Sequence, residues 1–200
     1  NAGIYNINLN INAGEVVVFC GESGCGKTTI SRLINGLIPG YYSGNLTGSV
    51  IVKGHEIYKN SINELSQYVG SVFQNPRTQF FNVDSTSEIA FACENFGISR
   101  EEICKRIGEV TKELNIKDLL DKSLFSMSGG EKQKIACASA AAMEPEIYVL
   151  DEPSSNLDIQ TIKMLKDIIK KWKEKKSTVV IAEHRLQYLI DIADRFIYMK

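Results

Sequence analysis

A glycine-rich segment near the start of the chain carries the clearest chemistry. Gly21-Glu-Ser-Gly-Cys-Gly-Lys27-Thr28 fits the pattern G-x4-G-K-[ST], whose backbone N–H groups can surround phosphate groups. Lys27 supplies an ammonium between the β and γ phosphates, and the Thr28 hydroxyl can ligate Mg²⁺. A helix beginning near Lys27 directs its positive end at the same anion. The residues predicted to bind a nucleotide are Gly21, Glu22, Ser23, Gly24, Cys25, Gly26, Lys27, Thr28 and Thr29.

Two adjacent carboxylates follow an apolar run in the second half of the chain. Ile147–Leu150 is typical of a buried strand, and Asp151 and Glu152 come directly after it. Ligands of open α/β sheets bind at the carboxyl ends of strands, so both acids should face the phosphate segment. We expect Asp151 to hold Mg²⁺, directly or through water, and Glu152 to deprotonate an attacking water. Taken alone, the pair is also compatible with a simple strand end before Pro153.

Gln74 and His184 follow two further predicted strands, at 69–73 and 178–182. A neutral amide at Gln74 can contact Mg²⁺ or the attacking water, and an imidazole at His184 can contact a γ-phosphate. Position alone is a weak signal, since a lone histidine is more often a structural hydrogen-bonding residue. Both are candidate catalytic residues, and Gln74 is also a candidate metal ligand.

The elements around these residues alternate between strands and helices. Strand patterns lie at 4–11, 16–20, 69–73, 147–150, 178–182 and 196–199. Helix patterns lie at 27–37, 85–95, 159–176 and 186–193, with further helices beginning after Ser99 and Ser128. This order predicts a mostly parallel α/β core that is interrupted by a helical subdomain.

Three helix starts show capping residues. Ser85, Thr86 or Ser87 can cap the first helix of the middle section. The segments 99–102 and 128–131 each have serine followed three residues later by glutamate, which is a capping box.

The composition excludes several classes of protein. Of 200 residues, 44% are apolar and 24% are charged, and the net charge is −1, so no basic field argues for nucleic acid. No apolar run is long enough to cross a bilayer. The five cysteines form no CxxC pair, which argues against a disulfide framework or a zinc site.

In combination, these motifs resemble those of the ABC-type ATPases over nearly the whole chain. The matching motifs are Walker A (21–28), the Q-loop (Gln74), the signature (Ser128-Gly129-Gly130-Glu131), Walker B (149–153), the D-loop (155–158) and the switch histidine (183–185). The resemblance implies a P-loop nucleoside triphosphatase core with an N-terminal antiparallel β subdomain, and ATP with Mg²⁺ as its ligands. It implies one domain over 1–200, with its core at about 1–80 and 144–200 and its helical subdomain at about 84–143.

The resemblance also implies a dimer with a second ABC ATPase, identical, homologous or fused. In this family the signature of one subunit closes over the ATP held by the P-loop of the other. The Ser128 hydroxyl and the amides of Gly129 and Gly130 suit a γ-phosphate, because they lie at a helix N-terminus. Glu131 stands where glutamine is common, so that it either weakens closure or only caps the helix. Asp158 is the corresponding D-loop residue.

A narrower resemblance is to the ATPases of energy-coupling factor (ECF) transporters, through the segments 72–81, 87–91 and 182–186. These bacterial systems import vitamins or transition-metal ions such as cobalt and nickel. The resemblance implies transmembrane partner subunits and a place on the cytoplasmic face of the membrane. Phe80 or Phe81 would then be an apolar anchor for the membrane partner, and a core position for both is the alternative.

Both ends of the sequence show strand patterns, so we expect a piece of a longer polypeptide. The aromatic residue that stacks on adenine in this family should precede position 1, because Tyr5 is too close to the P-loop. Two other functions compete with a transporter ATPase. A soluble ABC ATPase of a nucleic-acid system is disfavoured by the near-neutral charge, and a P-loop kinase or nucleotide sensor is disfavoured by the signature and Glu152.

Overall fold

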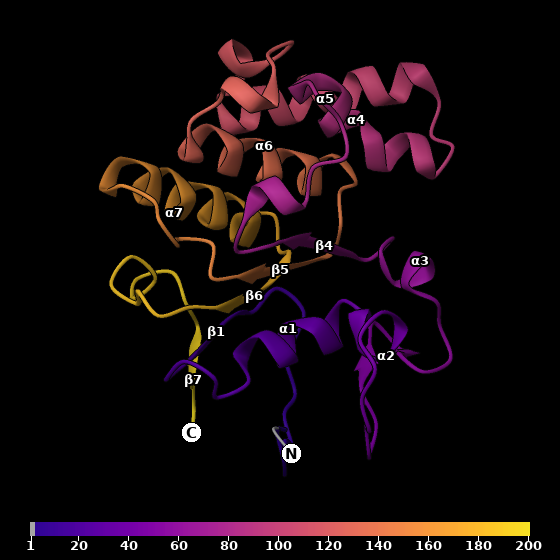
Figure 1. The fold of residues 1–200 in the computed structure, drawn as a ribbon, viewed down its shortest axis with the longest axis vertical. Helices are drawn as coiled ribbons and strands as arrows, with labels where there is room; N and C mark the ends of the chain where they lie inside the picture. Colours follow the sequence, from indigo (N-terminus) through magenta and orange to yellow (C-terminus); the bar gives the residue numbers. More distant parts are fainter. Residues whose placement is uncertain (1–2) are drawn as a thin grey trace.

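A five-stranded sheet forms the centre of the computed structural model, which describes residues 3–200 (Figure 1). Its strands are β1 (Val16–Gly21), β4 (Val69–Val72), β5 (Ile147–Asp151), β6 (Thr178–Ala182) and β7 (Arg195–Met199). They lie in the order β4-β5-β6-β1-β7, and every neighbouring pair is parallel. The predicted α/β fold with a mostly parallel sheet is confirmed.

Helices cover both faces of this sheet, which explains the uninterrupted apolar runs of its central strands. On one face, Val17 packs in a core shared with helix α1 (Lys27–Ile34). On the other face, Val18 packs in a core shared with helix α7 (Ile159–Glu174). Figure 1 shows α1 and α7 on opposite sides of the strands.

The carboxyl ends of the strands meet at one edge of the sheet. Asp151 pairs with Ala182, and Ala182 pairs with Phe19. The loops that follow β1, β5 and β6 therefore begin side by side, and the loop after β4 joins them because Val72 pairs with Leu150. Every polar residue singled out after a predicted strand leaves the sheet at this edge.

Three longer helices lie above the sheet in Figure 1, on the side opposite α1. They are α4 (Ser85–Asn95), α5 (Arg100–Leu114) and α6 (Gly129–Ala142). The alanine-rich α6 is the innermost, in contact with α4, α5 and β4, and Ile135–Ala138 within it is fully buried. Small side chains allow this close approach on several sides. The three helices fill the segment 84–143, whose boundaries as a subdomain stay a prediction.

A small antiparallel pair, β2 (Ile51–Val52) and β3 (His55–Glu56), lies outside the main sheet. The short helices α2 (Leu37–Gly40) and α3 (Ile62–Leu65) flank it in the sequence. Three 3-10 turns complete the described elements: Pro76–Thr78, Lys117–Leu119 and Leu124–Ser126. Among residues 3–200, no helix has both the length and the apolar character needed to cross a bilayer.

The strand predicted at 4–11 is not formed in the structure. Its apolar side chains do not share one buried face, since Ile4 and Ile11 pack against the core whereas Ile7 is 52% exposed. Asn6 also adopts a left-handed backbone with φ of 56°, which interrupts an extended chain. Alternation alone predicted a strand here, but a strand needs a partner and a face to bury.

Two helix starts differ from prediction. The cap of α4 is Asp84, whose Oδ1 accepts the Ser87 N–H at 2.9 Å, and not one of the three residues after it. Ser99 caps α5 as predicted, accepting the Glu102 N–H at 3.3 Å. Glu102 does not return the bond, because its carboxylate pairs with Arg106 on the next turn.

Two predicted helices are shorter than expected or missing. α1 ends at Ile34, because Gly36 turns the chain with φ of 73° before Leu37. The segment 186–193 forms successive turns in place of a helix, with Leu189 N–H bonded to Leu186 O and Ile192 N–H bonded to Leu189 O. Tyr188, Leu189 and Ile192 are buried in this compact loop, whereas Ile190 is 65% exposed.

Candidate functional site

The P-loop between β1 and α1 depends on glycine at two positions. Gly21 has φ of 147°, and a Cβ atom there would lie 2.2 Å from the Met199 carbonyl oxygen. Gly26 has φ of 99°, and its Cβ would lie 2.2 Å from Ile4 Cγ2. Both the backbone conformation and the space therefore require glycine.

Lys27 begins α1 and is 4% exposed. Its ammonium donates to the carbonyl oxygens of Gly21 at 3.0 Å and Glu22 at 2.9 Å, and lies 3.6 Å from Cys25 Sγ. The positive charge is thus held over the loop that the helix N-terminus faces. The other residues predicted to bind the nucleotide lie at the exposed loop tip or in the first turn of α1: Ser23, Gly24 and Thr29.

Thr28 brings the P-loop and the end of β5 into contact. Its Oγ1 donates to Asp151 Oδ1 at 3.0 Å. Burial raises the pKa of the Asp151 carboxyl; the Thr28 bond opposes this rise, and the nearby Glu152 adds to it. The predicted meeting of the phosphate segment with the first acid is therefore present in the structure.

This pair fits a hard divalent cation. A hydroxyl and a carboxylate oxygen lie side by side, and oxygen ligands are those that Mg²⁺ prefers. Because burial and a second carboxylate disfavour the charge on Asp151, a cation there would relieve an existing electrostatic penalty. Residues 3–200 contain no group of three or more His, Cys, Asp or Glu side chains suited to a metal. Thr28 and Asp151 are the residues that could hold such an ion, and Gln74, whose amide contacts Glu152, is the third predicted ligand.

Glu152 is the point where the other candidate catalytic residues converge. Gln74 Nε2 donates to its Oε2 at 2.8 Å, and His184 Nε2 lies 3.0 Å from its Oε1. The Glu152 backbone is left-handed, with φ of 44°, and its N–H donates to Ala182 O at 2.8 Å. This turn at the end of β5 directs the side chain away from the sheet and between the two partners.

The signature residues open α6 as a complete capping box. Ser128 Oγ accepts the Glu131 N–H at 3.2 Å, and the Glu131 carboxylate accepts the Ser128 N–H at 2.8 Å. These bonds hold the pKa of Glu131 below its ordinary value. A Cβ at Gly129 would meet nothing within 4 Å, whereas one at Gly130 would lie 2.5 Å from Thr161 Oγ1.

No hydrogen bond within residues 3–200 joins Ser128–Glu131 to the P-loop, so one chain does not bring these two predicted half-sites together. Asp158 is likewise apart from the P-loop. It caps α7 by accepting the Thr161 N–H at 2.7 Å. The sequence did not indicate this capping role.

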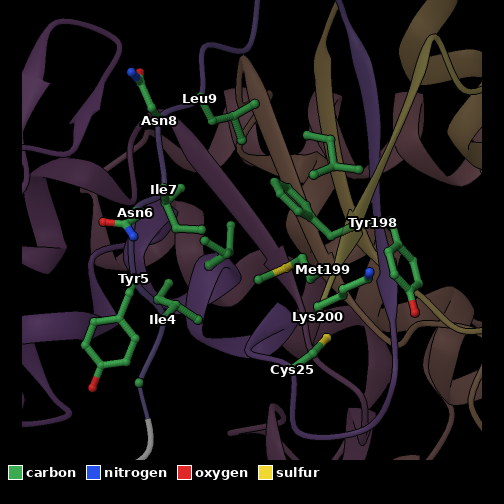
Figure 2. A pocket seen from close by; sticks show the side chains of 14 residues that line it. Ile4, Tyr5, Asn6, Ile7, Asn8, Leu9, Cys25, Tyr198, Met199 and Lys200 are labelled. Carbon is green, nitrogen blue, oxygen red and sulfur yellow. The ribbon is translucent and has the colours of Figure 1, made fainter.

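A groove of about 480 Å³ lies beside the P-loop, between the segment 3–9 and β7 (Figure 2). The P-loop contributes only Cys25 to its lining, and the rest is mainly aliphatic and amide side chains. Tyr5 points away from Met199 in this view. No residue of the predicted catalytic set lines the groove.

The sequence assigned no role to Glu183, which is buried directly before His184. Its carboxylate accepts hydrogen bonds from both the β5 and the β6 loops. The only signal was an acid at the end of an apolar strand, with Tyr188 five residues later, and many exposed loops share that pattern. Arg185, also without a role, donates to Leu157 O at 3.2 Å.

Comparison with known proteins agrees with this geometry. The sequence profile of the ABC transporter family matches residues 4–155. An ABC transporter ATP-binding protein of Treponema denticola is 53% identical over 195 residues, which are 98% of this chain and 40% of that protein. One of Pyrococcus horikoshii is 42% identical over 193 residues, covering 96% of this chain and 68% of that protein. The chain spans about 40% of the length of the first curated relatives it matches.

Two solved structures are also similar. CbiO1 of Clostridium perfringens, part of the ABC transporter complex CbiONQ, has a TM-score of 0.85 and 29% identity, covering 97% of this chain and 76% of that one. The dimeric ATP-binding cassette MJ0796, bound to ADP and Pi in a post-hydrolysis state, has a TM-score of 0.82 and 28% identity, covering 98% and 85%. The chain therefore belongs to the ABC transporter family, and its domain is one of that family's ATP-binding, ATP-hydrolysing domains.

Proposed function

We propose that this domain is the motor of an ABC transporter, in which ATP binding closes a dimer and ATP hydrolysis reopens it. One observation carries the proposal: Gln74 and His184 both contact Glu152, which directly follows Asp151, the partner of Thr28. A phosphate site, oxygen ligands for a cation and a positioned carboxylate thus lie at one sheet edge. These are the groups that the attack of water on a γ-phosphate requires.

In this proposal Lys27 and the P-loop amides bind the phosphates, and Mg²⁺ supplies charge neutralisation when it is bound. Glu152 takes a proton from the attacking water as general base. The amide of Gln74 and the imidazole of His184 each contact one carboxylate oxygen of Glu152, which keeps its side chain in one orientation. His184 is also within reach of a γ-phosphate that lies near Glu152. Positioning of this kind is a large part of catalysis in phosphoryl transfer.

The proposed partner is a second ABC ATPase domain, identical, homologous or fused to this one. Ser128, Gly129 and Gly130 lie at the N-terminus of α6, away from their own P-loop, and the space at Gly129 is open. An anion carried by another domain suits that position. The dimeric state of MJ0796 supports the same arrangement. Hydrolysis would then depend on closure, which completes each site from two domains.

The proposed subtype is an ECF-type importer of vitamins or transition-metal ions, acting at the cytoplasmic face of the membrane. Similarity to CbiO1 of the CbiONQ complex supports this subtype. The surface expected to meet the membrane partner presents Phe81, 76% exposed, and Val83, 65% exposed. Phe81 stacks on Phe91 with ring centroids 4.8 Å apart, while Phe80 packs against the helical core. Phe81 is therefore the anchor that we favour over Phe80.

Two experiments test the proposal. The first measures phosphate release from ATP when no phosphate-accepting substrate is present. The second purifies the protein from detergent-solubilised membranes and identifies what accompanies it. We expect Mg²⁺-dependent hydrolysis and an integral membrane protein in the purified complex. Phe81→Asp should release that protein and leave the hydrolysis by the ATPase dimer intact. Absence of hydrolysis would refute the motor function, and co-purification with nucleic acid in place of a membrane protein would favour the soluble alternative.

A further inference from the structure

We propose that Glu183 is a positioning residue, which fixes His184 and Glu152 relative to one another by binding both of their loops. This inference rests on the proposed function, since it assigns a part in the same hydrolysis. Glu183 is 2% exposed and is the first residue after β6. Four hydrogen-bond donors converge on its carboxylate, three of them backbone N–H groups.

One carboxylate oxygen shapes the loop that carries the histidine. Oε1 accepts the N–H of His184 at 2.7 Å and the N–H of Arg185 at 3.0 Å. These are the two residues that follow Glu183, so the chain turns around its own side chain at the strand end. The direction in which the His184 ring leaves the backbone is thereby fixed.

The other oxygen reaches the neighbouring loop. Oε2 accepts the N–H of Ser154 at 3.3 Å and the hydroxyl of Tyr188 at 2.9 Å. Ser154 lies two residues after Glu152, in the turn where Ser155 N–H donates to Glu152 O at 3.0 Å. Glu183 thus joins the loop of the general base to the loop of the histidine.

The consequence lies at the contact between the two side chains. His184 Nε2 and Glu152 Oε1 are 3.0 Å apart, although the residues are 32 positions apart in sequence. The strand ends are joined by the Glu152 N–H, which donates to Ala182 O at 2.8 Å, and farther along the Arg185 side chain donates to Leu157 O. Between these two bonds, the Glu183 carboxylate is the group that accepts from the backbones of both loops. A hydrogen-bond contact tolerates displacements of only a few tenths of an ångström. Loss of the Glu183 hydrogen bonds should therefore weaken the contact between His184 and Glu152. It removes no residue that contacts the nucleotide.

Replacement of the carboxylate by an amide of the same shape isolates this role. A glutamine at position 183 keeps one acceptor oxygen but presents an NH₂ group at the other position. In one orientation the NH₂ group would face the N–H of Ser154, so that two donors meet. In the other it would lose the hydrogen bonds from the N–H groups of His184 and Arg185. Aspartate keeps the charge but is one methylene shorter, so that it reaches only one of the two loops.

We would measure kcat for ATP and the ATP dissociation constant of Glu183→Gln in the full-length protein. The expected result is a fall in kcat of about 10- to 100-fold, with ATP affinity changed less than about twofold. In a His184→Ala background the same substitution should lower kcat by less than about threefold, because the positioned group is already gone. Asp194→Asn is the control. Asp194 accepts the Val16 N–H at 2.9 Å at the other end of the sheet, and its loss should not change kcat.

Equal effects of Glu183→Gln with and without His184 would overturn the inference, since a merely structural role predicts independence. If Glu183→Gln does not fold, Glu183→Asp replaces it, with the same two backgrounds and the His184 ring resonances in NMR spectra as a direct readout. Unshifted His184 resonances with normal kcat would also refute the positioning role of Glu183. An unaltered protein that releases no phosphate would refute the proposed function, whereas active enzyme with an equally active Glu183 variant would refute this inference alone.

Discussion

The sheet edge and the start of α6 are held by bonds of very different range. At the sheet edge, Thr28 meets Asp151 across 123 positions of sequence, and His184 meets Glu152 across 32. At the start of α6, the side chains of Ser128 and Glu131 each accept the other residue's N–H, three positions apart. The first site exists only when the whole fold is assembled, whereas the second is a local cap that a short helix can form.

The sheet edge and the start of α6 therefore differ in how much of a site each forms within one chain. At the sheet edge, one chain brings Thr28 to Asp151, and both Gln74 and His184 to Glu152. At Gly129 the signature segment faces open space, with no atom of residues 3–200 outside its own helical turn within 4 Å of where a Cβ would lie. A site distributed over two chains needs one partner of each kind. The following substitutions test that division.

Glu152→Gln should have the largest effect, because it removes the proposed base and keeps the side-chain shape. We expect kcat to fall by about 10²- to 10⁴-fold while ATP binding persists and the closed dimer accumulates. Phosphate release and light scattering with ATP measure the two effects. Normal turnover would remove Glu152 from its role as base.

Lys27→Ala should weaken ATP binding by about 100-fold, or ~3 kcal/mol, because a charge-assisted contact to phosphate is lost. Calorimetric titration with ATP provides the measurement. Lys163→Ala, on the exposed face of α7, is the matched control for the loss of one positive charge. Unchanged affinity in Lys27→Ala would show that the P-loop does not bind the triphosphate.

Ser128→Arg should leave ATP binding by the monomer within about twofold and weaken ATP-dependent dimerisation by about 30-fold, or ~2 kcal/mol. A bulky cation fills the space in front of the helix start while the P-loop stays untouched. Sedimentation with and without ATP separates the two quantities. A dimer of normal stability would mean that the signature segment does not act in the partner's site.

Glu131→Gln should have the smallest effect, since the amide oxygen can still accept the Ser128 N–H and only the charge is lost. The folded-state pKa of Glu131 lies below its ordinary value, so its stabilisation is present above about pH 4.3 and is lost as the pH falls through the folded pKa. We expect Tm to fall by about 1–2 °C at pH 7, with no difference between the proteins at strongly acidic pH. A pH-independent difference would exclude the charge as its cause.

The sequence was sufficient to predict elements that depend on neighbouring residues or on a regular spacing of apolar side chains. Val16–Cys20 and Ile147–Leu150 are apolar enough to indicate strands buried on both faces, and the acids after Leu150 follow from the rule for carboxyl ends. The parallel order of the strands then placed Asp151 near Thr28. A spacing of three residues correctly predicted the capping box at Ser128, whereas the same spacing at Ser99 gave only half of one, because Arg106 takes the Glu102 carboxylate.

The rest depended on partners that are distant in sequence. The segment 186–193 has helical spacing, but it forms successive turns that bury Tyr188, Leu189 and Ile192 without a helix. The segment 4–11 alternates like a strand but pairs with no other strand, and it leaves Ile7 and Leu9 exposed. The four bonds of Glu183 come from two loops that no sequence spacing relates. The 84–143 boundary and the roles of the site residues stay predictions that the variants above address.

The contact of Gly130 with Thr161 has a mechanical consequence. Even one extra carbon at Gly130 would come within 2.5 Å of Thr161 Oγ1, in the turn that Asp158 caps. The two segments expected to touch a neighbouring domain are therefore seated against each other in the same chain. We therefore expect a displacement of the start of α6 to shift the first turn of α7 as well.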